Sequence, residues 1–198
     1  MFIRTERLFL RPGWPEDWTE LLGLIADEGI VRNLARAPWP YRSEHARDFA
    51  RKGQHPRMPH FFVTLPGAGG STLIGTAGLG QAEDGSVQLG YWIARDHWNR
   101  GYATEAARAV LSLARTLGHG RITARHFLDN PASGRVLRKA GFAPTGRVTA
   151  SSSLARREPA LAALYVVDFD DAGGSDTPGG SNAPGGDDAM AGKVRRAA

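Results

Sequence analysis

Two short segments of the sequence carry the residues best suited to chemistry. Gly101 and Ala103 stand in "HWNRGYATEAARAVL", and Asn130 and Ser133 stand in "LDNPASGRVL", each just before apolar residues with helical spacing. Small residues at a helix start leave main-chain N–H groups accessible, and such groups bind anions such as phosphate. The first segment therefore predicts a diphosphate site. The alternative is a purely structural role, in which Gly101 forms the turn and Ala103 packs in the core.

Both segments belong to a strand, helix, strand, helix unit over residues 87–142. "VQLGYWIA" and "RITARHFLDN" are typical of strands, and apolar residues recur at three- and four-residue steps between them. Asn130 is the expected N-cap of the second helix, with Pro131 at its first position and Gly141 at its end. Parallel strands joined by a crossover helix place both helix starts at one edge of the sheet.

The remaining elements predict a mixed α/β fold. Strands are expected in "RLFLRP", "HFFVTL", "STLIGTAGLGQ", "TGRVTASSSL" and "ALAALYVVDF", the middle ones forming an antiparallel meander with hairpin turns. Helices are expected after Pro15 and after Ser43, the latter as an N-cap. The sum is a mostly antiparallel sheet of about seven strands flanked by about four helices.

Composition sets the outer limits. With 198 residues, of which 41% are hydrophobic, the chain has room for one domain, which we place at residues 1–170. Residues 171–198 are Gly, Ser, Pro, Asp and Ala with little to bury, so a disordered tail is expected there. The chain has no cysteine, which excludes disulfides, thiolate metal sites and a cysteine nucleophile.

Charge and motif searches exclude several other classes. The net charge is +5, but the basic residues form no stripe at helical spacing. They are therefore expected to lie on a solvated surface, without a specific nucleic-acid partner. "GTAGLGQ" precedes a turn and a strand instead of a helix, which excludes a dinucleotide-binding fingerprint. The six histidines lack metal-ligand spacing, and no apolar run has signal-peptide or membrane-span length. We expect a cytoplasmic protein without a metal, either monomeric or homodimeric.

The linked segments "LGYWIARDHWNRGYATEA" and "NPASGRVLRKAGF" resemble the GNAT superfamily of acyl-CoA-dependent N-acetyltransferases, in particular its ribosomal-protein-alanine N-acetyltransferase branch. The phosphate loop of that superfamily has Gln or Arg, two residues, Gly, one residue, then Gly or Ala. This frame falls on Trp98, Gly101 and Ala103, so Trp98 departs from it. The order of elements from Phe2 to Phe169 also matches.

The resemblance implies acetyl-CoA as co-substrate, bound where the fourth and fifth strands splay apart. Its pantetheine is expected to pair with the main chain of Trp92, Ile93 and Ala94. The candidate phosphate-loop residues are Trp98, Asn99, Arg100, Gly101, Tyr102, Ala103 and Thr104. Asn130 is either a pantetheine ligand as well as a cap or a cap alone. Arg95, Arg135 and Lys139 either neutralise phosphates or are solvated.

The resemblance also implies direct attack of an amine on the thioester. Gln88 stands where the branch often has a glutamate base, so that base is missing. His126 is the alternative base or a packed residue. Leu137 replaces a tyrosine acid, which leaves Ser133 as the hydroxyl near the sulfur or as a capping residue only. An N–H near Trp92 is expected to bind the oxyanion.

The acceptor groove is expected in "RNLARAPWPYR", where Trp39 and Tyr41 either line a site or plug the core. A protein N-terminal amine, with a pKa of about 8, needs less help to lose its proton than a lysine at about 10.4. The first interpretation is an acetyl-CoA-dependent N-acetyltransferase acting on a primary amine, for which a protein N-terminus is the favoured candidate. An aminoglycoside or polyamine acetyltransferase, or a catalytically silent acyl-CoA-binding module, remains the alternative.

Overall fold

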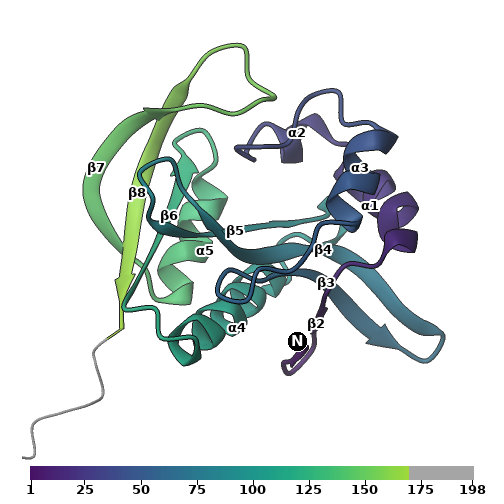
Figure 1. Cartoon of the computed structure of the whole chain (residues 1–198). Coiled ribbons are helices and arrows are strands. Elements are labelled where there is room, and N and C mark those ends of the chain that lie inside the picture. The colour runs from purple at the N-terminus through teal and green to yellow at the C-terminus, as the bar shows by residue number, and fades with distance from the viewer. Residues whose placement is uncertain (170–198) are drawn as a thin grey trace, which may run out of the picture.

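A twisted sheet runs through the centre of the protein and carries helices on both faces (Figure 1). The computed structural model describes residues 1–169, and the tail expected at residues 171–198 lies outside them. The strands are β1 (Ile3–Arg4), β2 (Phe9–Arg11), β3 (His60–Gly67), β4 (Gly70–Gln81), β5 (Val87–Ile93), β6 (Arg121–Phe127), β7 (Ala143–Ser151) and β8 (Ala160–Asp168). Their order in the sheet is β1-β2-β3-β4-β5-β6-β8-β7.

The mixed α/β, mostly antiparallel sheet is confirmed, since β5 and β6 form the only parallel pair among the described strands. The strand count is eight instead of about seven. The difference arises at the N-terminus, where Ile3 pairs with Leu10 and the expected single strand is a hairpin. A two-residue strand is too short to show alternation in the sequence.

Five α-helices cover the sheet within the described residues: α1 (Trp18–Ile25), α2 (Glu28–Val31), α3 (Ser43–Ala50), α4 (Tyr102–Thr116) and α5 (Pro131–Ala140). The sequence predicted about four, because the single turn of α2 is too short for a periodic pattern. The cap prediction at α3 was wrong: Arg42 is the N-cap, its N–H donates to Nδ1 of His45 at 3.0 Å, and Ser43 is the first helical residue. None of these helices is long and apolar enough to cross a membrane.

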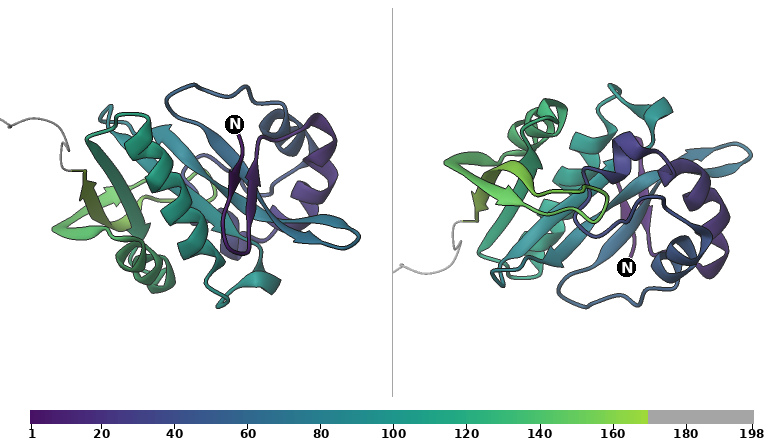
Figure 2. Two further views of the ribbon diagram at one scale, coloured as in Figure 1. Left: turned by 90° about the horizontal axis from the view of Figure 1, so that it is seen from below. Right: turned by 90° about the horizontal axis from the view of Figure 1, so that it is seen from above.

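The sheet separates two hydrophobic cores. Figure 2 shows the two faces in turn, with α4 crossing the sheet on one and the N-terminal helices lying on the other. Phe61 and Ile93 are buried on the α4 and α5 side, whereas their neighbours Phe62 and Trp92 are buried against α1 to α3. Because successive strand residues point to opposite faces, the apolar pairs in β3 and β5 serve both cores.

The expected splay between two central strands is confirmed. Strands β5 and β6 pair at one register position only, Gln88 with Thr123, and then diverge. Helix α4 forms the crossover between them, and α5 follows β6 directly. Both helix starts therefore face the opening that the diverging strands leave in the sheet.

Candidate functional site

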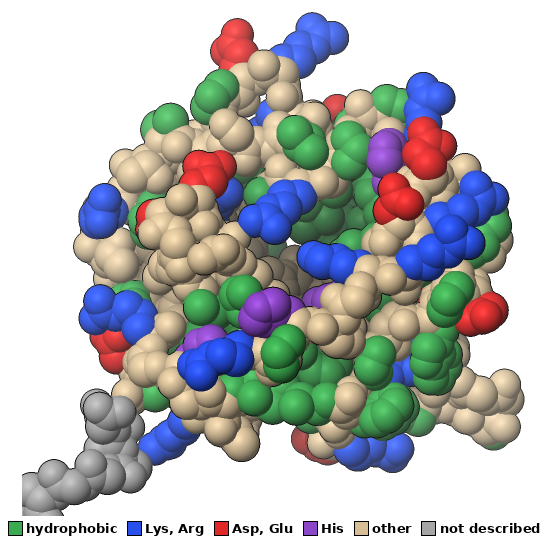
Figure 3. All heavy atoms as spheres, in the orientation of Figure 1, with side chains coloured by type: hydrophobic (Ala, Val, Ile, Leu, Met, Phe, Trp, Pro, Cys, Tyr) green, Lys and Arg blue, Asp and Glu red, His purple; other side chains and the backbone are tan. Residues whose placement is uncertain are grey.

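A cleft of about 660 Å³ occupies the opening between β5 and β6. Its walls are the segment after α2, strand β5, the start of α4, the end of β6 and the first turns of α5. In the space-filling view a hollow is bordered by Lys, Arg and His side chains (Figure 3). The predicted site residues that line the cleft are Trp92, Ile93, Trp98, Asn99, Gly101, Tyr102, Ala103, Thr104, His126, Asn130, Ser133 and Arg135.

The strand register decides which main-chain groups of β5 face the cleft. The N–H of Ala94 donates to the carbonyl of Ile74 at 2.8 Å, on the β4 side. Because main-chain groups alternate along an antiparallel strand, Trp92 also bonds toward β4, whereas Tyr91 and Ile93 direct theirs toward the opening. Of the expected main-chain ligands, Ile93 directs its groups to the opening, whereas Trp92 and Ala94 direct theirs to β4, so the N–H near Trp92 that could meet an oxyanion is that of Tyr91 or Ile93. Tyr91 takes their place beside Ile93.

The start of α4 leaves its first N–H groups without a capping side chain. Gly101 is the N-cap and has a left-handed backbone with φ of 82°, and Asn99 has φ of 60°. An L side chain at such a φ costs about 1–2 kcal/mol, so glycine suits this position. The helix then begins at Tyr102 with uncapped donors directed at the cleft, which is the geometry expected of an anion site.

Trp98 fastens this loop to the end of β5. Its indole Nε1 donates to the carbonyl of Ile93 at 2.6 Å. Trp98, at the first position of the phosphate-loop frame, therefore positions the loop through this single N–H donor. Nearby Arg95 bonds both carboxylate oxygens of Asp27, at 2.6 and 2.8 Å, and these bonds help to hold the pKa of Asp27 below its usual value. Arg95 is thus engaged with Asp27 and is not among the residues that line the cleft.

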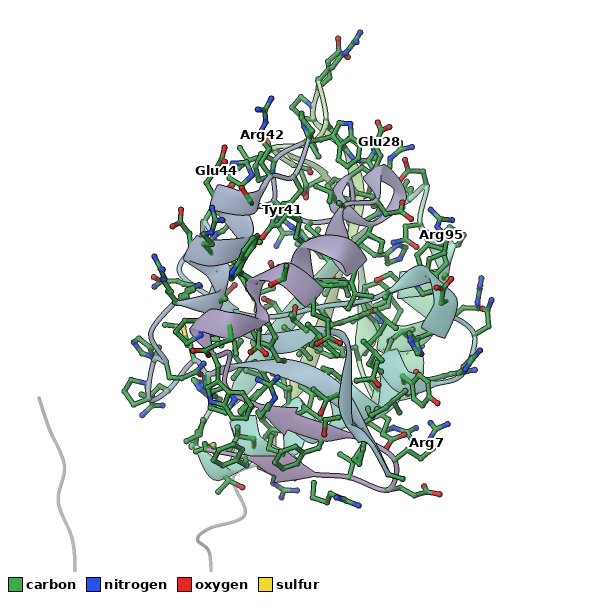
Figure 4. All side chains as sticks on the ribbon, turned by 90° about the vertical axis from the view of Figure 1, so that its right-hand side faces the viewer. Arg7, Glu28, Tyr41, Arg42, Glu44 and Arg95 are labelled. Carbon is green, nitrogen blue, oxygen red and sulfur yellow. The ribbon has the colours of Figure 1, made fainter. Side chains whose placement is uncertain are left out.

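Arg7, which the sequence analysis missed, supports the loop from the N-terminal hairpin (Figure 4). Its Nη1 donates to the carbonyl of Arg100 at 2.9 Å, and its Nε donates to Glu105 at 2.8 Å. Its guanidinium also lies 4.7 Å from the ring centre of Tyr102. The ion pair neutralises the Glu105 carboxylate in the first turn of α4, where its charge would otherwise repel a bound anion.

A pair of hydroxyls faces the cleft where β5 meets α5. The side-chain oxygens of Tyr91 and Ser133 lie 2.8 Å apart, and the Tyr91 hydroxyl also reaches the Ser133 carbonyl at 3.2 Å. Burial raises the pKa of Tyr91 to about 12, so its hydroxyl stays protonated. The Asn130 side chain accepts the Ser133 N–H at 3.3 Å, which confirms the predicted cap. A tyrosine hydroxyl is thus present beside Ser133, although it comes from strand β5 and not from the position of Leu137.

His126 lines the cleft with a defined tautomer. Its Nδ1 lies 2.8 Å from the carbonyl of Phe127, which can only accept, so the neutral ring carries its proton there and its lone pair on Nε2. The Nε2 atom packs on Gly134, where an added Cβ would lie 2.5 Å away. Gln88, at the position of the expected glutamate, contributes a neutral amide to the same cleft.

Comparison with known proteins identifies the family. The model of the acetyltransferase (GNAT) domain matches residues 7–143, more than half of the chain. The chain belongs to the GNAT acetyltransferase family. The probable N-acetyltransferase YjcK of Bacillus subtilis (strain 168) is 40% identical over 155 residues, covering 73% of this chain and 84% of that protein. The protein is accordingly an N-acetyltransferase.

Solved structures agree with this assignment. A GNAT-family acetyltransferase from Bacillus anthracis superposes with a TM-score of 0.71 at 25% identity, covering 85% of this chain and 98% of that one. RimL, described as a ribosomal L7/L12 alpha-N-protein acetyltransferase in complex with coenzyme A, gives a TM-score of 0.69 at 18% identity, with 86% and 99% covered. The latter likeness supports the fold.

Several predicted site residues of this N-acetyltransferase lie outside the cleft. Ala94 and Arg100 do not line it. Tyr41 is 8% exposed, packs among the N-terminal helices (Figure 4) and donates to the His45 carbonyl at 3.2 Å, so its interpretation as a groove residue was wrong. Trp39 is 40% exposed and lines a second cavity of about 710 Å³. Arg32 lines both cavities, so they adjoin.

Proposed function

We propose that this enzyme transfers an acetyl group from acetyl-CoA to the N-terminal amine of a protein, with acetyl-CoA bound in the cleft between β5 and β6. The observation that carries the proposal is the start of α4, where Gly101 has a left-handed backbone and no side chain caps the helix. This helix start lines the same cleft as the main-chain groups of β5 that are directed away from β4. The N–H groups at the helix start suit a diphosphate, and the main chain of β5 suits the amides of pantetheine, which pair with a strand edge as an added strand would.

The residues of the cleft fit the cofactor along its length. The diphosphate is assigned to the N–H groups from Arg100 to Thr104, and pantetheine to the main chain of Tyr91 and Ile93. Arg135 and Lys139, which line the cleft, add positive charge near the phosphates. Asn130 remains a proposed pantetheine contact in addition to its role as helix cap.

Bound acetyl-CoA supplies a thioester carbon that the acceptor amine attacks, forming a C–N bond and breaking the C–S bond. We assign the Ser133 hydroxyl to donate a hydrogen bond to the sulfur as negative charge develops there. The two hydroxyls lie 2.8 Å apart and either can be the donor; we assign Tyr91, which stays protonated, as the donor, so that the serine hydrogen is left for the cleft. A thiol is a tolerable leaving group, so this weak donor is sufficient.

We assign the proton of the amine to His126, which lines the cleft and carries its lone pair on Nε2, the ring atom that packs beside Gly134. An N-terminal amine, with a pKa of about 8, is partly neutral near pH 7 and needs only a weak base. The charged residues lining the cleft are Arg32, Arg125, Asp129, Arg135 and Lys139, a net positive set. This charge disfavours polyamine and aminoglycoside acceptors, and the Tyr91 and Ser133 pair favours an enzyme over a silent binding module.

Thiol release from acetyl-CoA in the presence of N-terminal peptides, aminoglycosides and polyamines tests the proposed function. We expect release with peptides that have a free α-amine and none when the same peptides are N-terminally blocked. Release with the polyamines alone would overturn the proposed acceptor. Coenzyme A binding without release for any amine in the panel would identify a binding module.

Arg7→Ala is expected to raise the dissociation constant of acetyl-CoA about three- to tenfold, because it frees the Arg100 carbonyl and leaves Glu105 charged beside the diphosphate. Calorimetric titration measures the change. Arg121→Ala is the matched control, since Arg121 also forms an exposed ion pair, with Asp168, but makes no bond to the loop before α4. An equal loss of affinity in both variants would show that Arg7 has no specific role in the loop.

A further inference from the structure

Arg125 is a half-buried cation in the cleft without a carboxylate partner. It follows Ala124 on β6 and lines the cleft from there. Its Nη1 reaches the hydroxyl of Ser151 at 3.4 Å, a long contact with a neutral group, and no described carboxylate lies within ion-pair distance. A partly desolvated guanidinium favours an anion that it can bind with two parallel hydrogen bonds.

The carboxylates around Arg125 are already engaged elsewhere. Asp84, in the turn before β5, accepts from the Ser86 hydroxyl at 2.7 Å and from the Ser86 N–H at 3.0 Å. Those two bonds lower the pKa of Asp84, and the charge of Arg125 is a smaller contribution. Asp129 accepts from Arg32 and from Arg156, each at 2.9 Å. Positive charge therefore remains in excess in the lining of the cleft.

The second cavity gives an acceptor chain a path away from Arg125. Arg32 borders both hollows, and Trp39 and Leu154 line the second one with 40% and 66% of their surfaces exposed. Exposed large apolar side chains beside a polar rim are typical of a surface that binds a peptide. Figure 3 shows the hollow of this face bordered by basic side chains. A free amino acid would leave this second cavity unused.

We propose that the acceptor is a peptide N-terminus with an Asp or Glu side chain within its first few residues, and that Arg125 binds this carboxylate. The peptide then continues past Arg32 to Trp39 and Leu154. This inference rests on the proposed function, because it names the acceptor for the same cleft. Arg125 is thus a specificity residue, and it takes no part in the bond exchange at the thioester.

The test uses three peptides that differ only at the third residue, which is Glu, Gln or Lys, and measures thiol release as kcat/KM. The wild-type enzyme is expected to have a kcat/KM about tenfold higher for the Glu peptide than for the Gln peptide, and lowest for the Lys peptide. A tenfold preference is what one charge-assisted bidentate contact to Arg125 would give. Arg125→Gln should reduce the preference for Glu over Gln to about twofold or less. Arg125→Glu should favour the Lys peptide.

Arg121→Gln is the control on the same strand, since Arg121 pairs with Asp168 and does not line the cleft, and it should keep the preference for the Glu peptide. Equal use of the Glu and Gln peptides by wild type would overturn the proposal, as would an unchanged preference in Arg125→Gln. Acetylation of free glutamate as efficiently as the Glu peptide would overturn the path over Trp39.

Binding separates this inference from the proposed function. If no peptide is acetylated, the proposed function fails, but titration of the three peptides into the protein saturated with coenzyme A still decides the role of Arg125. Tighter binding of the Glu peptide by wild type than by Arg125→Gln supports the anionic acceptor site. Equal or undetectable binding of all three peptides contradicts it.

Discussion

Gly101→Val is expected to raise the dissociation constant of coenzyme A by about tenfold or more. The left-handed φ of 82° at Gly101 is disfavoured for a β-branched residue, so the loop must change shape to accept valine. A Cβ there would also lie 3.3 Å from Nη2 of Arg7, the residue that holds the loop. Both effects disturb the N–H groups assigned to the diphosphate, and calorimetric titration measures the result.

Gly118→Val is the matched control for this variant. Gly118 lies just after the other end of α4, has a similar φ of 76°, and has nothing within 4 Å of an added Cβ. The two substitutions should lower the melting temperature comparably, since a residue held in a disfavoured backbone region costs about 1–3 kcal/mol. Only the change at Gly101 should weaken coenzyme A binding. A similar loss of affinity at Gly118 would attribute the effect to general destabilisation.

Ser133→Ala and Tyr91→Phe are each expected to lower kcat, by about 10- to 100-fold for the serine and less for the tyrosine, with little change in coenzyme A affinity. In the proposed mechanism the serine hydroxyl bonds the sulfur only as the C–S bond breaks, so its loss should raise the barrier without weakening ground-state binding. Tyr91 acts through Ser133, 2.8 Å away, as a positioning residue. The double variant should therefore be no slower than Ser133→Ala, because the two hydroxyls work as one unit.

Steady-state kinetics with a peptide acceptor measure these effects, and Tyr165→Phe serves as the control. Tyr165 is a second buried tyrosine in the same core, but its hydroxyl accepts from Arg138 and has no contact with Ser133. Burial raises the pKa of Tyr91 to about 12, so the contribution of the pair should stay constant from pH 6 to pH 9, well below that value. Full turnover in Ser133→Ala would remove Ser133 and Tyr91 from the mechanism.

Local features of the site could be predicted from the sequence because they depend on neighbouring residues. The cap at Asn130 and the glycine at Gly101 follow from rules that span a single turn of chain, and both are confirmed. The contacts that complete the site are long-range: Arg7 meets Glu105 across 98 positions, and Tyr91 meets Ser133 across 42. No periodicity or motif spacing indicates such partners.

The errors in the predicted site also have physical causes. A shift of one residue along a strand exchanges the edge to which its main-chain groups point, and the sequence does not reveal the pairing of β5 with β4 that sets this choice. Trp39 and Tyr41 share an aromatic, proline-flanked context, yet one is exposed and the other is core. Only the packing of α1 and α3 distinguishes them.

A crystal structure of the protein with bound coenzyme A tests the central claim most directly. The account predicts that diphosphate oxygens lie within hydrogen-bonding distance of the N–H groups at the start of α4, with the pantetheine arm beside the main chain of Tyr91 and Ile93. Coenzyme A bound at another surface, with those N–H groups untouched, would contradict the account.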